Sequence, residues 1–130
     1  MRLMKLKFFY VNQKKLLGYF IIFASIFINK NLFGQIVYTV DTPQEADLIV
    51  FVVDSEDKCD LKVFFVEEKH QLGKDGVWMG TFNIAEADKK VYFTFEEKEA
   101  QLKIFVVDKE EDAGWRNEEK KKLMSKDKNK

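Results

Sequence analysis

The sequence predicts a mainly β domain in which six short units close around a common core. One observation is a repeat of 13 residues, interrupted once by two extra residues. A second is that each unit opens with β-branched and aromatic residues, which favour strands. A third is that each unit ends in a polar stretch of helix-forming residues. In order, the units begin at Val37, Val50, Val63, Trp78, Val91 and Ile104.

The opening of each unit predicts a strand. In the second unit, for example, residues 50–53 contain only valine and phenylalanine. These runs are apolar throughout rather than at alternate positions. The pattern therefore predicts strands that are buried on both faces or lie at a tight centre.

The second half of each unit predicts a compact return built on one helical turn. An Asp followed by helix formers and then a small residue is typical of a capped turn. The predicted caps, at the fifth position of their units, are Asp41, Asp54 and Asp108. The predicted turn residues, at the eleventh position, are Asp47, Asp60 and Asp88.

Units of this size are each too small to bury a core alone, so the six must share one. An open β-solenoid would stack them in a row, but thirteen residues is short for a solenoid coil. Neither end of the repeat has a dedicated polar cap. We therefore expect a closed domain in which strands from the two halves of the chain interleave, with the open β-solenoid as the alternative.

The repeat also carries a family resemblance. Valine and an aromatic residue open four of the six units, and four units have an acid at the fifth position. Four units have alanine at the tenth position and three have aspartate at the eleventh. The last copy closes on residues 112–117, which include Ala113, Gly114 and Trp115. Over about residues 36–117 this pattern resembles the bacterial family named for a seven-crossing (septoil) knot. The resemblance implies a mainly β domain with a torus-type knot and no established activity. The fourth unit departs from the pattern, because Trp78 to Phe82 replaces the usual opening after the two inserted residues.

Residues 1–34 have the composition of a secretory signal peptide. A basic segment through Lys15 precedes thirteen apolar residues, 16–28, and a short polar segment follows. The apolar stretch is short for a membrane span, which needs roughly 20 residues. We expect cleavage after Gly34, which leaves Gln35 first and makes the protein periplasmic or secreted. The alternative is a retained N-terminal anchor.

The charges are segregated along the chain. Residues 1–34 hold six basic and no acidic residues, whereas residues 35–116 hold ten Lys and Arg against nineteen Asp and Glu, a net −9. Phosphate binding needs clustered basic residues, so the acidic body argues against nucleic acid as a partner. Residues 117–130 hold six Lys and three acids, and their composition predicts a disordered Lys-rich tail after the 35–116 domain.

Two reactive residue types occur once each in the chain. His70 is the only histidine and Cys59 the only cysteine. His70 occupies a repeat position that accepts many residue types, which predicts a surface histidine. Cys59 replaces the alanine of sister units and has Asp57 and Asp60 nearby, which disfavour a thiolate. We interpret it as a small buried hydrophobe and not as half of a Cys–His catalytic pair.

The acidic residues suggest a second class of function, a carboxylate-based or calcium-assisted hydrolase. The run from Asp54 to Asp57, followed by Asp60, is the richest in carboxylates. It lacks the spacing of a helix-loop-helix calcium loop. Acids outside the repeat pattern, such as Asp75 and Glu86, are the ones to replace in a test of this alternative.

We expect a specific role, if the domain has one, in the most irregular stretch, residues 73–80. Trp78 and Met79 beside glycines indicate either a contact surface or a buried connection. Trp115 is expected to plug the core. We therefore expect a non-catalytic, cofactor-free binding or structural module of the cell envelope. No catalytic, cofactor-binding or metal-binding residue is predicted. The partner is an unidentified protein or envelope component, and the oligomeric state is left open.

Overall fold

Each of the six repeat units supplies one strand, as the sequence predicts. The computed structural model describes residues 34–125. Five strands begin two residues before the first position of their unit, and the fourth begins one residue before it. The strands are β1 (Gln35–Thr39), β2 (Leu48–Val52), β3 (Leu61–Val66), β4 (Val77–Gly80), β5 (Lys89–Phe93) and β6 (Leu102–Val106).

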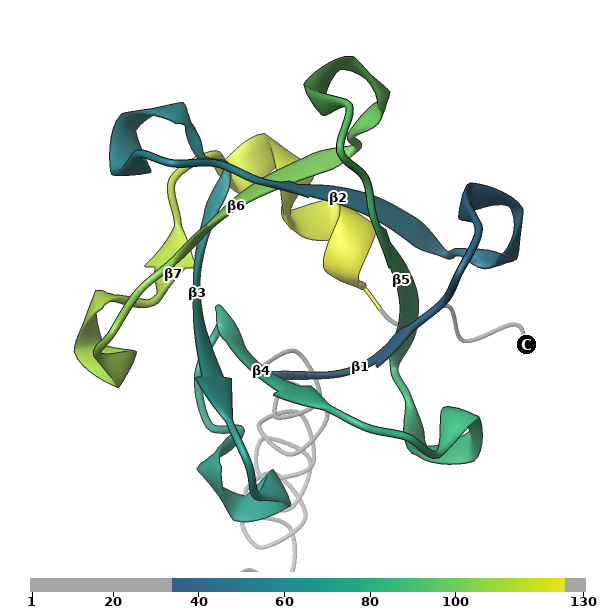
Figure 1. The fold of residues 1–130 in the computed structure, drawn as a ribbon. Coiled ribbons are helices and arrows are strands. Elements are labelled where there is room, and N and C mark those ends of the chain that lie inside the picture. The colour runs from purple at the N-terminus through teal and green to yellow at the C-terminus, as the bar shows by residue number, and fades with distance from the viewer. Residues whose placement is uncertain (1–33, 126–130) are drawn as a thin grey trace, which may run out of the picture. The chain divides into compact units, whose positions relative to one another are not determined.

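The six strands form a closed parallel barrel around which the chain makes two laps (Figure 1). Around the barrel the order is β4, β1, β5, β2, β6, β3, and β3 pairs with β4 to complete the ring. The first lap therefore lays down β1, β2 and β3, and the second places β5 and β6 in the gaps between them. This interleaved closure confirms the closed architecture and excludes the open solenoid.

The two inserted residues lie between β3 and β4, where the first lap ends and the second begins. Every other connection between consecutive barrel strands skips one place in the ring, whereas β3 and β4 are direct neighbours. The turn between them contains Gly76, whose φ of 86° is a conformation that side chains rarely adopt. A Cβ atom there would lie 2.5 Å from the backbone oxygen of Lys62. The irregular fourth unit thus supplies the single-place step that lets the second lap interleave with the first.

The barrel interior forms the main core. Alternate strand residues point inward and are fully buried, among them Leu48, Val50, Leu61 and Val63, and Trp78 joins them from β4. The residues between them are half-buried on the outer wall. Burial on both faces was therefore the wrong expectation for most strands.

The predicted returns are single turns of 3-10 helix. These are η2 (Pro43–Glu45), η3 (Glu56–Lys58), η4 (Lys69–Gln71), η5 (Ile84–Glu86), η6 (Glu97–Glu99) and η7 (Glu110–Asp112). The cap residue is one position later than predicted. Thr42, Ser55 and Lys109 precede the turns, and none of them makes a side-chain cap hydrogen bond. The assignment of Asp41, Asp54 and Asp108 as caps is therefore wrong, and Asp54 instead forms an ion pair with Lys58 (3.3 Å).

The eleventh-position acids bind the start of a neighbouring strand. Asp60 donates its N–H to the oxygen of Lys103, and its Oδ2 accepts the N–H of the same Lys103 (2.9 Å). The same two-way contact joins Asp47 to Lys90. It also joins Asp88 to Ile36, and Gln101 to Ile49. These side chains are more than the turn residues the sequence predicts, because each extends the hydrogen-bond ladder beyond the end of the paired strand.

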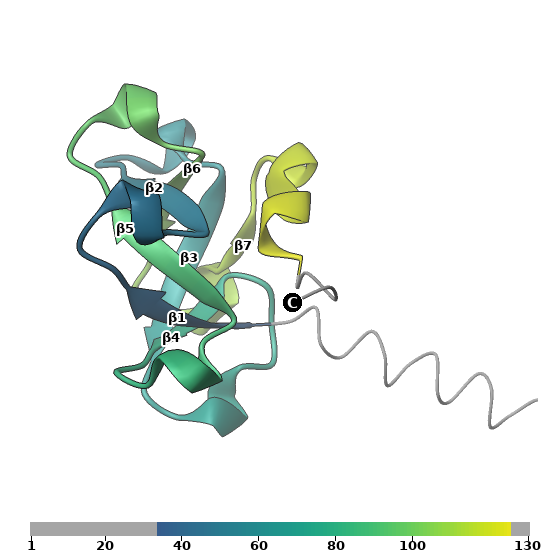
Figure 2. The ribbon, with the colours of Figure 1, turned by 90° about the vertical axis from the view of Figure 1, so that its right-hand side faces the viewer.

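The end of the described chain is ordered, which differs from the predicted disorder after residue 116. Strand β7 (Gly114–Trp115) pairs antiparallel with the first half of β3. Helix η8 (Glu118–Met124) follows it and lies across one end of the barrel (Figure 2). Trp115 and Met124 pack on the core, as expected for Trp115. Lys120 reaches Asp60 (3.1 Å) and Lys121 reaches Asp75 (3.1 Å). The lysines thus anchor this segment instead of leaving it solvated.

The predicted signal peptide and the last five residues of the predicted tail lie outside the described residues, apart from Gly34. Within residues 34–125, no helix has the length and apolar character needed to cross a membrane.

Candidate functional site

The two ends of the barrel differ. All six barrel strands are parallel, so their carboxyl ends lie at one end, while η8 covers the other (Figure 2). The end formed by the carboxyl ends of the strands, with the residues that follow them, is called the mouth. In eight-stranded βα barrels, which are also closed and parallel, active sites lie at this end, because loop residues from several strands converge there.

The mouth is lined by apolar side chains that continue the inward-facing rows of the core. Val52, Phe65 and Val106 each follow a buried residue by two positions, yet they are 47%, 42% and 42% exposed. Phe65 lies edge-on to Trp78, with ring centroids 6.2 Å apart. Because no element covers them among the described residues, these side chains form an apolar floor open to solvent.

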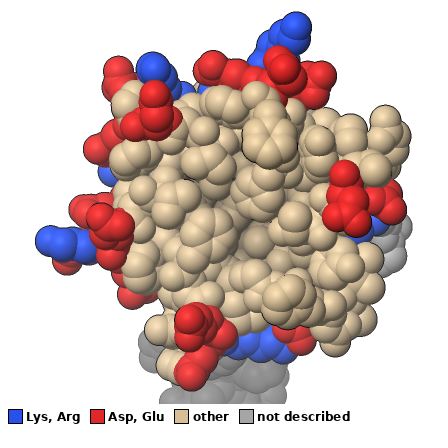
Figure 3. Space-filling view, in the orientation of Figure 1, with Lys and Arg blue, Asp and Glu red and all other residues tan. Residues whose placement is uncertain are grey.

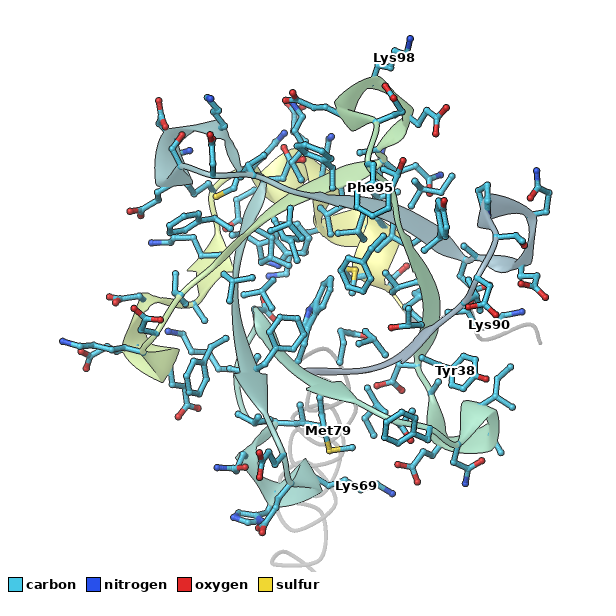
Figure 4. All side chains as sticks on the ribbon, in the orientation of Figure 1. Tyr38, Lys69, Met79, Lys90, Phe95 and Lys98 are labelled. Carbon is cyan, nitrogen blue, oxygen red and sulfur yellow. The ribbon has the colours of Figure 1, made fainter. Side chains whose placement is uncertain are left out.

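Two phenylalanines of the return loops stand at the rim. Phe82 is 104% exposed and Phe95 is 94% exposed. They occupy the fifth position of their units, where the other four units have an acid. In Figure 4, Phe95 lies nearer the barrel axis than Lys98, which marks the outer tip of the same loop.

A change in the preceding residue explains how these loops fold without the acid. The hydroxyl of Thr81 accepts the N–H of Asn83 (3.0 Å) and donates to Glu86 (3.0 Å). Thr94 makes the corresponding bonds to Glu96 and Glu99. The threonine holds the loop together, so the fold itself does not need the phenylalanine that follows.

The strand order makes the rim two-sided. Going round the ring, the fifth-position residues are Phe82, Asp41, Phe95, Asp54, Asp108 and Glu67. Phe82 and Phe95 thus lie on either side of Asp41 in one half of the rim, and the other half has only acids. The space-filling view of this end shows an uncharged, hollowed centre, with Asp and Glu and some Lys and Arg around its circumference (Figure 3).

A comparison with protein families agrees with the closed, two-lap arrangement of the strands. A family profile described as the 7(1) septoil knot domain matches residues 34–116. The chain belongs to this family. No curated protein and no solved structure matches it. The match covers every barrel strand and ends with β7, as the sequence resemblance implied.

The only histidine and the only cysteine of this septoil knot domain lie in different environments, one at the surface and the other in the core. The His70 side chain is 76% exposed and its Nδ1 lies 3.1 Å from Glu68, which confirms a surface histidine. Cys59 is 6% exposed, which confirms a buried one. Burial raises the pKa of the Cys59 thiol, despite the nearby Arg116. A neutral, buried thiol is a poor nucleophile.

The acidic candidates each have local structural partners. Among the acids of the 54–60 run, Asp57 accepts a bond from Ser55 (2.6 Å) and Asp60 binds Lys103 and Lys120. Within residues 34–125, no group of three or more His, Cys, Asp or Glu side chains is placed to hold a metal ion. The two acids outside the repeat are also engaged, Asp75 with Lys121 and Glu86 with Thr81.

The irregular fourth unit does not form the contact surface that the sequence offered as one interpretation of Trp78 and Met79. Trp78 is fully buried and Met79 is 6% exposed, so the buried interpretation is confirmed. The exposed aromatic residues of the septoil knot domain lie just beyond, at Phe82 and in the next unit at Phe95. Sequence reasoning missed them, although their departure from the acid at the fifth position was the signal that could have found them.

Proposed function

We propose that this protein is a non-catalytic, exported binding module, and that its mouth binds an apolar side chain from a basic protein segment. The observation that carries the proposal is the exposure of Phe82 and Phe95 at a repeat position that is otherwise acidic. A fully exposed phenylalanine contributes nothing to the core. Aromatic residues are, however, typical anchors of protein interfaces.

The charge of the domain supports a basic partner. Residues 35–116 carry a net −9, and four of the six fifth-position residues around the mouth are acids. Asp and Glu lie among some Lys and Arg around the mouth in Figure 3. A complementary basic segment would be steered to this face. Nucleic acids and anionic lipid surfaces would be repelled by the same carboxylates, so a protein partner fits better than either.

The proposed location rests on the N-terminal segment. Its basic, apolar and polar parts have the order of a secretory signal. A partner in the cell envelope or outside the cell follows from that proposal.

The test compares the wild-type protein with the double variant Phe82→Asp/Phe95→Asp. Aspartate is the residue that three sister units carry at this position, so the fold should be retained. The probe is a labelled short peptide of lysines around one central phenylalanine, followed by fluorescence anisotropy. Control peptides replace the central phenylalanine with asparagine, or the lysines with glutamates. Lys98→Gln, which makes the charge of the same loop more negative by one, is the matched control variant.

We expect the wild type and Lys98→Gln to bind the basic phenylalanine peptide, with affinity falling as salt is added. The double variant should bind at least about tenfold more weakly, although its two added carboxylates favour a basic peptide. Equal binding by the double variant would contradict the proposal. Binding that ignores the central residue would also contradict it, because charge alone would then explain the interaction.

A further inference from the structure

The floor of the mouth is not filled equally around the ring. On four strands the third position of the unit holds a large apolar residue; these residues are Val52, Phe65, Phe93 and Val106. On the neighbouring strands β1 and β4 the same position holds Thr39 and Gly80, and both are exposed. A Cβ atom added to Gly80 would have nothing within 4 Å beyond its own chain neighbours. The floor therefore has a hollow at β1 and β4, with the hydroxyl of Thr39 beside it.

Asp41 lies at the rim over this hollow, since it follows the floor residue of β1 by two positions. The N–H of Val40 bonds to β5 (2.9 Å), and the N–H of Thr81 bonds to β1 (3.0 Å). These bonds hold β4, β1 and β5 side by side up to the residue before the fifth position. A group that binds the Asp41 carboxylate therefore has Phe82 and Phe95 in the neighbouring places of the ring. Both rings are almost fully exposed, so a ligand can reach them.

The same part of the rim has few basic residues. The returns at residues 40–47 and 81–88 contain no Lys or Arg, whereas each of the other four returns contains at least one. Lys69 reaches the second of them from its own return, and it pairs with Glu86 (3.4 Å). Among the described residues, no basic side chain forms an ion pair with Asp41. Its carboxylate is therefore available to a cation from a partner.

This combination of groups suits arginine better than lysine. The guanidinium group is planar, so it can stack on an aromatic ring while two of its N–H groups bond to a carboxylate. It has further N–H donors, one of which can bond to the hydroxyl of Thr39. The ammonium group of lysine is a compact, strongly hydrated charge that does not stack in this way.

We infer that the partner segment binds through an arginine, whose guanidinium pairs with Asp41 between Phe82 and Phe95. The inference rests on the proposed function, because it names the cation of the same basic segment. The apolar side chain of that segment lies on the filled part of the floor, over Val52 and Phe65. The mouth thus has two parts, one for a guanidinium and one for an apolar group.

The experiment compares two peptides of equal charge by fluorescence anisotropy. One is the lysine peptide with a central phenylalanine that tests the proposed function. In the other, arginine replaces the two lysines beside that phenylalanine. The ratio of their affinities for one protein measures the preference for guanidinium and is insensitive to overall charge. We expect the wild type to bind the arginine peptide about fivefold more tightly.

The variant Asp41→Asn should reduce this preference to less than about twofold, because the carboxylate that pairs with the guanidinium is lost. The matched control is Asp108→Asn, the same change at the same repeat position in the half of the rim that has only acids. It removes the same charge and should keep the preference.

Equal affinity of the wild type for the two peptides would overturn the inference, while binding of the lysine peptide would leave the proposed function standing. A preference that survives in Asp41→Asn would also overturn the inference alone, as would an equal loss in Asp108→Asn. Failure of both peptides to bind the wild type would overturn the inference and the proposed function together.

Discussion

Replacing Asp60 with alanine is predicted to be the most damaging change at the eleventh repeat position. Asp60 is 7% exposed, and its carboxylate accepts three hydrogen bonds. The donors are the N–H of Lys103 (2.9 Å), the Nζ of Lys120 (3.1 Å) and the Nδ2 of Asn117 (3.3 Å). The first bond joins β3 to the start of β6, and the other two attach η8. Loss of the carboxylate therefore weakens both the barrel and the segment that covers its end.

The magnitude follows from the number and kind of these bonds. A bond to a charged group contributes about 1.5–3 kcal/mol, and a partly exposed ion pair less than about 1 kcal/mol. With the weaker bond to Asn117, Asp60→Ala should lower the free energy of unfolding by about 4 kcal/mol. Gln101→Ala is the matched control at the same repeat position. Its side chain makes one neutral, exposed bond to the N–H of Ile49, and its loss should cost about 1 kcal/mol.

The assay is urea unfolding of the two variants and the wild type at neutral pH. Samples are held until unfolding and refolding curves coincide, because passage through a knotted topology is expected to be slow. The difference of about 3 kcal/mol corresponds to roughly 12–24 °C in melting temperature for a domain of this size. If Asp60→Ala were no less stable than Gln101→Ala, the assignment of Asp60 as the central contact between barrel and η8 would be refuted.

The same carboxylate predicts a pH dependence. Burial alone would raise the pKa of Asp60, but bonds from the Lys103 N–H, Lys120 and Asn117 outweigh it and lower the pKa below its usual 3.8. The stability that Asp60 contributes is thus fully present above pH 3.8 and is lost as the pH falls through the lower folded value. Asp60→Asn should show a shallower loss of stability than the wild type below pH 3.8. Parallel curves would contradict this reasoning.

Three further predictions concern the step between laps, the thiol and the covered end. Gly76→Ala should destabilise the protein by more than about 2 kcal/mol in thermal unfolding, because its Cβ would meet the oxygen of Lys62. Gly80→Ala, with open space around its Cβ, is the control and should be near neutral. Cys59 should react with a thiol reagent at pH 7 far more slowly in the native protein than in urea, since burial raises its pKa; equal rates would contradict its burial. Met124→Ala should cost about 2–4 kcal/mol by urea unfolding, as a 6% exposed side chain leaves the core; an unchanged midpoint would show that η8 does not cover the barrel.

Part of the candidate sites was within reach of the sequence. The fifth-position exceptions at Phe82 and Phe95 are visible in the repeat, because four sister units have an acid there. Their exposure was not predictable, since an aromatic residue in a strand-rich repeat is usually core. The contact between Gln35 and Met124 was beyond prediction, because the two residues are 89 positions apart and meet only through the closed barrel.

By itself, the sequence determined what depends on neighbouring residues. A thirteen-residue period of apolar and polar halves places each strand and each return to within two residues, because strand propensity and turn formation are local. Cys59 was placed inside for the same reason, because its sister units fill that repeat position with small or apolar residues. For Trp78 the sequence left both a contact surface and a buried connection open.

Only the tertiary structure decided which strands are neighbours and what the acids do. Asp60 and Lys103 are 43 residues apart, and nothing local distinguishes a ladder-extending carboxylate from a turn residue. The lysines after residue 116 are typical of a solvated tail in the sequence. In the structure, Lys120 contacts Asp60 and Lys121 contacts Asp75. These cases have one physical reason. Hydrogen bonds between distant segments stabilise the chain only once the barrel has closed. Closure in turn depends on the turn at Gly76, which makes β3 and β4 direct neighbours and so places β5 and β6 between the strands of the first lap.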